Sequence, residues 1–584
     1  MCGIAGFSCG SLGEPPSPQQ LDTVRRALRH RGPDASGTWR SNDGRAALVH
    51  TRLAIIDLTP SGAQPMHFSG GRYHMVFNGE IYNYLELRET LESHGHAFVG
   101  SSDTEVLLTL FALKGPSCLD DLDGMYAFAV YDSLEHTLFL ARDPLGEKPL
   151  YYLSRPGFFA FSSEVRALVQ AGLASTTPDP KGIAFLFRQG SVPPPYTHLR
   201  DVRSLEPAHW IRVNASAHIE TRRRYWQIPF LSEQDGLHDR EQAAERLHHV
   251  LLESVRRRAR ADVPIAAMLS GGVDSGAVCA FLMEAGVSDL RTFTVTLPGQ
   301  ATDEARLARA TAEHLGTRHT EIPLMLDAQT QWVEEALAAM DVPSIDGPNT
   351  WLVSRAIAEA GLKVACSGLG GDELFFGYSN FQTVPKASRV CRLLGPLRHA
   401  RCLTKRVARR LPAAGRVSRG VEALLAGGTV AALWFARRGL LSHAELRDVL
   451  ESSIWSEAAD VDPVERLEAL GCPQGLSVER QVSFYELSAY MHDQLLRDTD
   501  TMSMAHSLEI RVPLIGRRVV ETVASFSTEV LAGDEPKSLL RGLVAGRLPH
   551  SVLNGAKRGF GLNWQNILAG FPTLQPDRLP LGIS

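Results

Sequence analysis

The chain has 584 residues, a formal net charge of −5 and a hydrophobic content of 44%. A single hydrophobic core does not grow to this size, so two or more domains are expected. The mild acidity argues against nucleic acid as the main partner, and no apolar run approaches membrane-spanning length. The eight cysteines contain no CxxC pair, which argues against zinc or a disulfide framework. With no signal-peptide pattern at the start, the protein is expected to be cytoplasmic.

The first 210 residues alternate short apolar runs with Gly, Asp and Pro turns, which predicts antiparallel sheets with a few helices. Leu21, Val24 and Leu28 have helical spacing, and a second helix is predicted from Asp103 to Gly115. Strands are predicted over four ranges: 75–77, 126–131, 137–140 and 158–161.

The pattern changes after a predicted linker over residues 211–240. Strands then alternate with helices, which predicts a doubly wound, mostly parallel sheet. The predicted strands span 263–269, 291–297, 320–324 and 362–366, and the predicted helices between them span 303–316 and 327–340. From about residue 385 to the end, the chain is expected to be helical.

The stretch "MCGIAGF" places Cys2 directly behind the initiator methionine. A small residue at this position allows the methionine to be removed, which would leave a thiol and an α-amine on one residue. An α-amine with a pKa of about 8 can act as the base that activates a thiol. The alternative interpretation is a small buried residue at the start of an edge strand.

Two glycine-rich stretches follow predicted strands of the parallel sheet. In "MLSGGVDSG", the glycines let the backbone approach a ligand, the N–H groups of a helix N-terminus favour an anion, and Asp274 could hold Mg²⁺. "CSGLGGDELFFGY" repeats the arrangement with Asp372. No GK[ST] follows, so neither is a Walker A loop. Both stretches fall at the carboxyl edge of one sheet and predict a nucleotide site, although each alone could be an ordinary turn.

Polar residues also gather in the first half, in "RHRGPDASG", "HTRLAIIDL" and "FNGEIYN". Taken singly, these have simpler explanations. Asn78-Gly79 fits a tight hairpin turn, and Asp103 fits a helix N-cap.

Together, these stretches resemble the glutamine-hydrolysing asparagine synthetase family over essentially the whole chain. The shared stretches are "MCGIAGF", "RHRGPD", "HTRLAIIDL", "FNGEIYN", "SSDTE", "SGGVDS", "SGLGGDELF" and "DTMSMAHSLEIRVP". The resemblance implies an α+β N-terminal-nucleophile hydrolase sandwich in residues 1–210, acting as a class II glutaminase. It also implies an ATP-binding, ATP-pyrophosphatase-type synthetase domain in residues 241–584, with an α/β doubly wound sheet and a helical C-terminal part.

For the first domain, the resemblance implies that Cys2 attacks the glutamine amide to give a glutamyl thioester and ammonia. Asn78 and the Gly79 N–H match the oxyanion hole, and Arg52 would pair with the glutamine α-carboxylate. Two carboxylates would hold the α-ammonium group: Glu80 and Asp103.

For the second domain, the resemblance implies ATP and Mg²⁺ as cofactors, and an acyl adenylate and pyrophosphate as products of activation. The matching pyrophosphate loop comprises Ser270, Gly271, Gly272, Asp274 and Ser275. Ser367 and Gly368 would flank the nucleotide, and Val295 would meet the adenine through its backbone. Asp274 and Asp372 would share Mg²⁺, and Lys537 would stabilise charge during adenylation. Ammonia would reach this site through an internal tunnel.

Four positions depart from the family pattern, all in the second half. Leu369 stands where relatives often have a glutamate that handles the proton of the attacking ammonia, and leucine has no base. Glu373 and Asp346 are candidate substitutes. The other three departures are Gly276 for a serine, Thr501 for an arginine, and Gly516 for an aspartate. The four departures bear on the identity of the acceptor rather than on ammonia production or adenylation. Leu369 predicts a bulkier, partly apolar carboxylic acid as the acceptor, with weak or absent asparagine formation.

Three functions follow as hypotheses. The first is a glutamine-dependent amidotransferase whose acceptor is aspartate or another metabolite acid. The second is an ATP-dependent lactam- or macrolactam-type ligase that uses an internal amine, against which the intact glutaminase residues count. The third is a catalytically silent member of the family. The expected partners are the small molecules glutamine, ATP and a carboxylic acid; nucleic acid and membrane are not expected, and a homodimer is left open.

Overall fold

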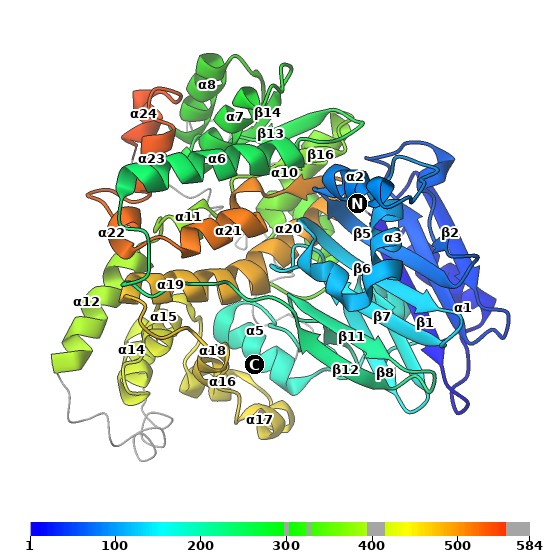
Figure 1. Ribbon diagram of the computed structural model, residues 1–584. Helices are drawn as coiled ribbons and strands as arrows, with labels where there is room; N and C mark the ends of the chain where they lie inside the picture. Colours follow the sequence, from blue (N-terminus) through cyan, green and yellow to red (C-terminus); the bar gives the residue numbers. More distant parts are fainter. Residues whose placement is uncertain (1, 297–302, 324–328, 394–414, 556–584) are drawn as a thin grey trace.

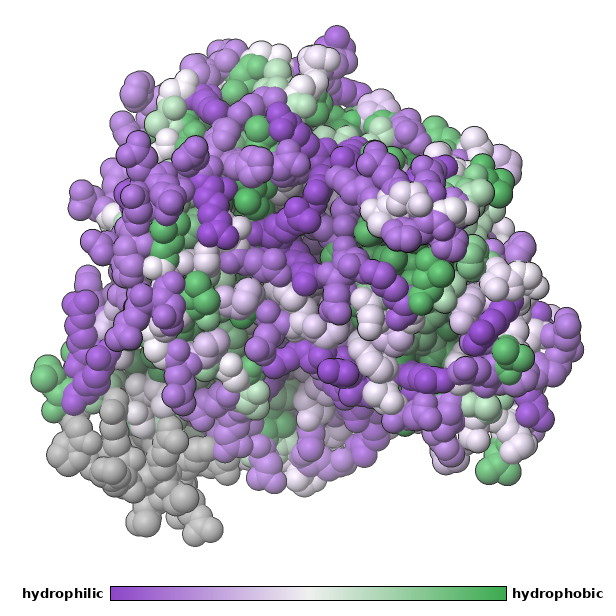
Figure 2. All heavy atoms as spheres, viewed as in Figure 1, coloured by the Kyte–Doolittle hydropathy of each residue, from purple (hydrophilic) through white to green (hydrophobic). Residues whose placement is uncertain are grey.

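The computed structural model describes residues 2–296, 303–323, 329–393 and 415–555. Figure 1 shows the blue and cyan strands of the N-terminal part on one side of the molecule and the green to orange helices on the other. In these described ranges, no helix is both long and apolar enough to cross a membrane. Figure 2 shows a mainly hydrophilic face on which apolar residues form small groups.

The first antiparallel sheet has the strand order β10-β8-β9-β1-β3-β2. Its strands are β1 (Cys2–Cys9), β2 (Ala35–Arg40), β3 (Ala46–Arg52), β8 (Tyr151–Arg155), β9 (Phe158–Ser162) and β10 (Arg203–Ser204). The β1–β3 register pairs Cys2 with Arg52. These two predicted site residues therefore lie directly opposite each other on adjacent strands.

The second antiparallel sheet has the order β12-β11-β7-β6-β5-β4. Its strands are β4 (Met66–Phe68), β5 (Tyr73–Ile81), β6 (Gly124–Asp132), β7 (Thr137–Arg142), β11 (His209–Val213) and β12 (Ile219–Arg224). The four strands predicted in the first 210 residues are confirmed, within β5, β6, β7 and β9. Part of the predicted linker instead forms β12 and most of β11, because a charged edge strand with exposed arginines lacks the apolar run that marks a strand.

Apolar side chains from both sheets meet in one core, among them Ile4 and Phe161 from the first and Val76 and Leu140 from the second. Helices cover the outer faces: α1 (Pro18–Ala27), α2 (Tyr84–Ser93), α3 (Asp103–Lys114) and α4 (Val165–Gln170). In contrast, α5 (Pro180–Gln189) packs against helices of the C-terminal part. The helix predicted from Asp103 is confirmed as α3, and it ends where Gly115 adopts a φ of 58° that favours glycine.

A parallel sheet forms the centre of the second half, in the order β15-β14-β13-β16-β17. Its strands are β13 (Ile265–Met268), β14 (Arg291–Thr296), β15 (Arg318–Pro323), β16 (Val364–Cys366) and β17 (Glu509–Arg511). The four predicted strands are present, although their predicted ends at residues 297 and 324 lie outside the described residues. β17 falls in the region predicted to be helical, because three residues are too few to give a strand period.

Helices flank this sheet: α6 (Arg240–Arg258), α7 (Val273–Glu284), α8 (Asp303–Leu315), α9 (Gln329–Ala339), α10 (Pro348–Glu359) and α11 (Gly371–Leu374). The helices predicted over 303–316 and 327–340 correspond to α8 and α9, with residues 327 and 328 outside the description. Since β14 and β16 lie on opposite sides of β13, the chain order reverses there. The loops after β13 and β16 therefore border the crevice where such sheets bind ligands.

The described residues of the C-terminal part are largely helical, as predicted, while residues 394–414 and 556–584 of that prediction lie outside the described residues. Its helices are α12 (Asn380–Leu393), α14 (Gly415–Leu425), α15 (Val430–Arg438), α16 (His443–Val449), α17 (Ser452–Ala458), α18 (Pro463–Ala469), α19 (Val478–Tyr485), α20 (Arg497–Met504), α21 (Arg517–Ala524), α22 (Thr528–Leu531), α23 (Ser538–Leu543) and α24 (His550–Leu553). Between α19 and α20 the chain forms a π-helix over Glu486–Leu496. Such helices are rare and concentrate at functional sites.

Candidate active sites

The first candidate site is built around Cys2, which is buried at the start of β1 with 8% of its surface exposed. Its backbone nitrogen donates a 2.9 Å hydrogen bond to Asn78 Oδ1 on β5. The other end of that amide, Asn78 Nδ2, is buried and has no hydrogen-bond partner in the described part of the chain. An unpaired buried donor costs about 1–3 kcal/mol, so this N–H group is suited to a ligand oxygen.

Gly79, next along β5, has a φ of 153°. A Cβ at this position would lie 2.1 Å from the Met125 carbonyl oxygen, so the strand accommodates only glycine here. Asn78 and Gly79 lie within the nine-residue strand β5, paired with Ala127 and Tyr126 of β6. The hairpin-turn interpretation of these two residues is therefore wrong.

Arg52 is held by a neighbouring loop. Its Nη1 donates to the Thr59 carbonyl at 2.9 Å, and its Nη2 donates to the Asp57 carbonyl. Burial raises the pKa of the Cys2 thiol above its ordinary value of 9.0, and the Glu80 carboxylate raises it further, while the charge of Arg52 lowers it. The thiol therefore rests in its neutral form and needs a base to become a nucleophile.

Asp103 and Glu80 form a buried acidic pair beside this site. Asp103 Oδ2 accepts a 2.9 Å hydrogen bond from the Ile81 nitrogen, whereas the N-cap of α3 is Ser102, so the capping interpretation of Asp103 is wrong. Burial raises the pKa of Asp103 to about 6. Glu80 Oε1 lies 3.5 Å from Arg511 Nη2, which extends from β17 of the parallel sheet. The positive charge of Arg511, from the second half of the chain, therefore lies beside the first site.

Arg31, in the stretch "RHRGPD", lies beside Cys2 but was not predicted from the sequence to be a site residue. Its Nε donates to the Cys2 carbonyl at 3.1 Å, and its Nη1 donates to Glu164 at 3.2 Å. Its Nη2 donates to Asp500 at 2.8 Å, and Lys148 Nζ lies 3.3 Å from the same carboxylate. The motif identified the segment, but the partner of Arg31 lies far away in sequence and no local pattern indicates it.

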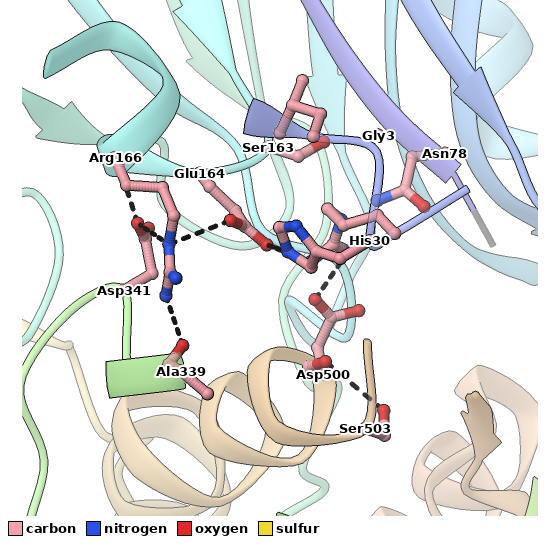
Figure 3. A network of polar contacts seen from close by, with 12 residues as sticks. Gly3, His30, Asn78, Ser163, Glu164, Arg166, Ala339, Asp341, Asp500 and Ser503 are labelled. Atoms are coloured by element: carbon pink, nitrogen blue, oxygen red, sulfur yellow. Dashed lines mark hydrogen bonds and ion pairs between the residues drawn. The ribbon is translucent and has the colours of Figure 1, made fainter. Parts of the chain in front are cut away.

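This network joins the two halves of the chain. Figure 3 shows Glu164 and Arg166 with Asp341 on one side, and Asp500 with Ser503 of α20 on the other. Arg166 Nε lies 3.3 Å from Asp341 Oδ1, and the same carboxylate accepts from the Val165 and Arg166 nitrogens at 2.6 and 2.8 Å. Buried charges that are paired in this way fix geometry more than they add stability.

The second candidate site lies at the carboxyl edge of the parallel sheet. After β13, the Ser270 nitrogen donates to Ser275 Oγ at 3.1 Å, and that hydroxyl donates to the Gly272 carbonyl at 3.2 Å. These bonds curl the loop over the first turn of α7. The loop borders a cavity of about 770 Å³, whose lining includes the predicted residues Gly271, Gly272 and Asp274. Backbone N–H groups at the start of a helix suit a phosphate there.

The loop after β16 packs directly against the loop after β13. A Cβ on Gly368 would lie 2.6 Å from the Ser275 nitrogen, so glycine is required for this approach. Lys537 Nζ contacts Asp274 Oδ2 and lies 2.6 Å from Asp372 Oδ1. The two aspartates that were predicted to bind a metal therefore contact the same ammonium group. Carboxylate oxygens such as theirs are suitable ligands for Mg²⁺.

A second cavity, of about 320 Å³, adjoins the first, and its lining includes the three residues expected to flank the nucleotide: Val295, Ser367 and Gly368. Leu369 is half-buried and lines both cavities. None of the described residues that line the smaller cavity is lysine, arginine or histidine. Its charged lining residues are all acidic: Asp274, Glu304, Asp372 and Glu373.

Two other positions that depart from the family pattern, Gly276 and Gly516, have little room for a side chain. A Cβ on Gly276 would lie 2.9 Å from Leu548 Cδ1. A Cβ on Gly516 would lie 2.8 Å from Arg258 Nη1, and Arg258 stacks 4.4 Å from the centre of the Tyr82 ring. Nothing in the structure explains why Thr501 stands where the family pattern has an arginine.

Comparison with known families decides the assignment. A glutamine amidotransferase domain matches residues 1–226, and an asparagine synthase domain matches residues 246–572. The second match alone spans more than half of the chain. The chain belongs to the asparagine synthase family. The sequence-based assignment to a family of glutamine-hydrolysing, ATP-dependent ligases is thereby confirmed.

Relatives within the asparagine synthase family match over most of their length. A putative glutamine-hydrolysing asparagine synthetase of Mycobacterium bovis is 32% identical, covering 96% of this chain and 87% of the relative. Asparagine synthetase 1 of Bacillus subtilis is 29% identical, with the same two coverages. Amidase chry2 of Gibberella zeae is 31% identical, covering 65% of this chain and 60% of the relative.

Proposed function

We propose that the chain hydrolyses glutamine at Cys2 and uses the ammonia to amidate a carboxylic acid that ATP has activated as an acyl adenylate. The observation that supports the glutaminase reaction is Asn78, whose Oδ1 accepts a hydrogen bond from the Cys2 nitrogen while its buried Nδ2 has no hydrogen-bond partner among the described residues. The strands of residues 1–224 would act as the N-terminal-nucleophile glutaminase, and the later residues as the synthetase.

In the glutaminase, the α-amine exposed by methionine removal would accept the proton of the Cys2 thiol. The sulfur then attacks the amide carbon, and the oxygen that becomes negative accepts hydrogen bonds from Asn78 Nδ2 and the Gly79 nitrogen. The proton passes from the α-amine to the leaving nitrogen, which departs as ammonia, and water hydrolyses the thioester. Arg52 would bind the α-carboxylate. The acidic pair would bind the α-ammonium group: Glu80 and Asp103.

In the synthetase, the loop after β13 would bind the ATP phosphates through its N–H groups, and Val295, Ser367 and Gly368 would flank the nucleotide. Asp274 and Asp372 would hold Mg²⁺, which when bound offsets the charge of the departing pyrophosphate. Lys537, already placed between these aspartates, would move onto the phosphate oxygens. Its ammonium would stabilise the charge that builds up as the acceptor carboxylate attacks.

The acceptor that the cavity favours is larger and less charged than aspartate. Aspartate keeps a second carboxylate, which needs a cationic partner. The described lining of the smaller cavity provides none, and the cations of the adjoining cavity, Arg306, Lys537 and Arg541, share that cavity with the loop proposed to bind the phosphates. Leu369 instead offers apolar surface, and burying it fully against a substrate would contribute roughly 1.5–3 kcal/mol. A partly apolar monocarboxylic acid meets both conditions.

The test is an acceptor screen with the purified protein, glutamine, ATP and Mg²⁺. The probe acids are acetate, aspartate, glutamate, benzoate, phenylacetate and octanoate, and pyrophosphate, AMP and glutamate are measured. Faster pyrophosphate release with an aromatic or aliphatic acid than with aspartate is expected. Efficient glutamine-dependent asparagine synthesis would instead restore aspartate as the acceptor, and release of ADP and phosphate would exclude adenylation.

The same screen separates the other two hypotheses. A ligase that uses an internal amine would release pyrophosphate with an amino-acid substrate without consuming glutamine. A silent family member would form neither glutamate nor pyrophosphate with any acid.

A further inference from the structure

Amidation of an acyl adenylate requires a proton acceptor at the second site. As the ammonia nitrogen bonds to the carbonyl carbon, the nitrogen becomes positively charged. The bond from that carbon to the phosphate oxygen breaks, and AMP leaves with the electron pair. One N–H proton must pass to a base for the neutral amide to form. Leu369 cannot accept it, although it lines the cavity where the reaction would take place.

Glu373 lines the same cavity as Leu369. It belongs to the short helix α11, directly after Asp372, and only 1% of its surface is exposed. The Tyr378 hydroxyl donates a 2.7 Å hydrogen bond to Glu373 Oε1, and Tyr378 also lines the cavity. A carboxyl group and a phenol are therefore paired at the wall of the space that would hold the acyl adenylate.

The surroundings hold this pair in place. The Arg438 guanidinium lies 4.3 Å from the centre of the Tyr378 ring and 3.7 Å from that of Tyr490, which comes from the π-helix. Arg438 is itself fixed by a 2.6 Å ion pair with Glu486. The phenol thus packs between charged and aromatic groups from three different helical segments.

We propose that Glu373, oriented by Tyr378, accepts the proton of the attacking ammonia when the acyl adenylate is amidated. The inference rests on the proposed function. Asp346, the other candidate substitute, is not among the described residues that line the cavity. Its carboxylate instead accepts a 2.8 Å hydrogen bond from the Gly347 nitrogen.

The test separates the two steps of the synthetase reaction. Adenylation is followed by ATP–pyrophosphate exchange, using the probe acid that releases pyrophosphate fastest. Amidation is followed with hydroxylamine as the nucleophile, because it is a weaker base than ammonia and is neutral at the pH of the assay. Glu373→Gln keeps the shape of the side chain and should slow amidation by about 10²–10⁴-fold while leaving the exchange rate unchanged. Tyr378→Phe should cost amidation up to roughly tenfold, the effect of one hydrogen bond.

Asp346→Asn is the matched control and should change neither step. Equal losses in exchange and amidation, or unchanged amidation, would overturn the inference. If the parent itself releases no pyrophosphate with any probe acid, the proposed function fails and the inference fails with it.

Discussion

The Arg31 guanidinium donates a 2.8 Å hydrogen bond to the Asp500 carboxylate, joining residues that are 469 positions apart in the chain. Both side chains are almost completely buried. Through its Nε, the same arginine donates a hydrogen bond to the Cys2 carbonyl, so the segment that bears the proposed nucleophile is attached to α20 of the other half.

Asp500→Asn should uncouple the two halves. It leaves two buried cations, Arg31 and Lys148, with less negative charge, and breaking a buried pair costs about 3–5 kcal/mol. We expect a lower melting temperature and slower glutamate formation, with ATP–pyrophosphate exchange retained. Asp22→Asn, at an exposed ion pair, is the control and should change neither. Equal loss of both activities would mean that the pair only supports the fold.

Cys2→Ala should abolish glutamine-dependent product while ammonium-dependent product stays near normal, because the nucleophile and the nucleotide loops belong to different sheets. Glutamate and amide formation are measured with each nitrogen source. Cys9→Ala, a buried cysteine at the other end of β1, should keep both activities. Glutamate formation that persists in the Cys2 variant would refute its role as nucleophile.

Asn78→Asp keeps an oxygen for the Cys2 nitrogen and replaces the unpaired Nδ2 donor with an acceptor. Loss of one oxyanion donor should lower kcat for glutamine hydrolysis by about 10²–10³-fold, with a smaller change in KM. Asn83→Asp makes the same change at a buried asparagine whose partners are Asp121 and Asp123. A similar kcat loss there would point to a general effect on folding.

Asp274→Asn and Asp372→Asn should each lower ATP–pyrophosphate exchange by orders of magnitude, because each removes one of the two charges that converge on Lys537. Raising the Mg²⁺ concentration should recover part of the loss. Glutamine hydrolysis at Cys2 should continue at a basal rate in both variants. Exchange that is insensitive to both substitutions would exclude these residues as the metal site.

Acid should weaken the buried charge network around Glu164, in which Arg31 and Arg166 also contact the other half of the chain. Burial raises the pKa of Glu164, but the charges of His30, Arg31 and Arg166 outweigh it and hold that pKa below its ordinary value of 4.5. A carboxylate with a lowered folded-state pKa stabilises the protein above its unfolded pKa, and this stability is lost as pH falls through the folded pKa. Urea midpoints should therefore fall below about pH 4.5, and less steeply in Glu164→Gln. Parallel curves for the two proteins would contradict this origin.

The sequence predicted the elements whose signals are local. The predicted strands, which fall in all three sheets, are present because apolar runs between glycine and proline turns have few other solutions. The two glycine-rich loops could be placed because a glycine-rich turn after a parallel strand fixes which edge of the sheet it borders. The motifs also placed Cys2 and Asn78, which the structure brings within one hydrogen bond of each other.

Contacts across the chain could not be predicted. Arg31 has the same sequence context whether it faces solvent or Asp500, and Glu373 reads as an ordinary helical carboxylate until Tyr378 is placed beside it. β12 was missed because its arginines face solvent at a sheet edge. In each case, the deciding partner lies on another element, and periodicity within one segment carries no information about it.

The late position of β17 affects the order in which the protein can be assembled during synthesis. All strands of the two antiparallel sheets have been synthesised once residue 224 is added, whereas the parallel sheet is completed only when Glu509–Arg511 pairs with β16. We therefore expect the N-terminal unit to fold first, since domains generally fold as units during translation. Until Arg511 arrives, Glu80 lacks its buried counter-charge and β16 is an open edge, so a chain released before residue 509 should be prone to aggregation.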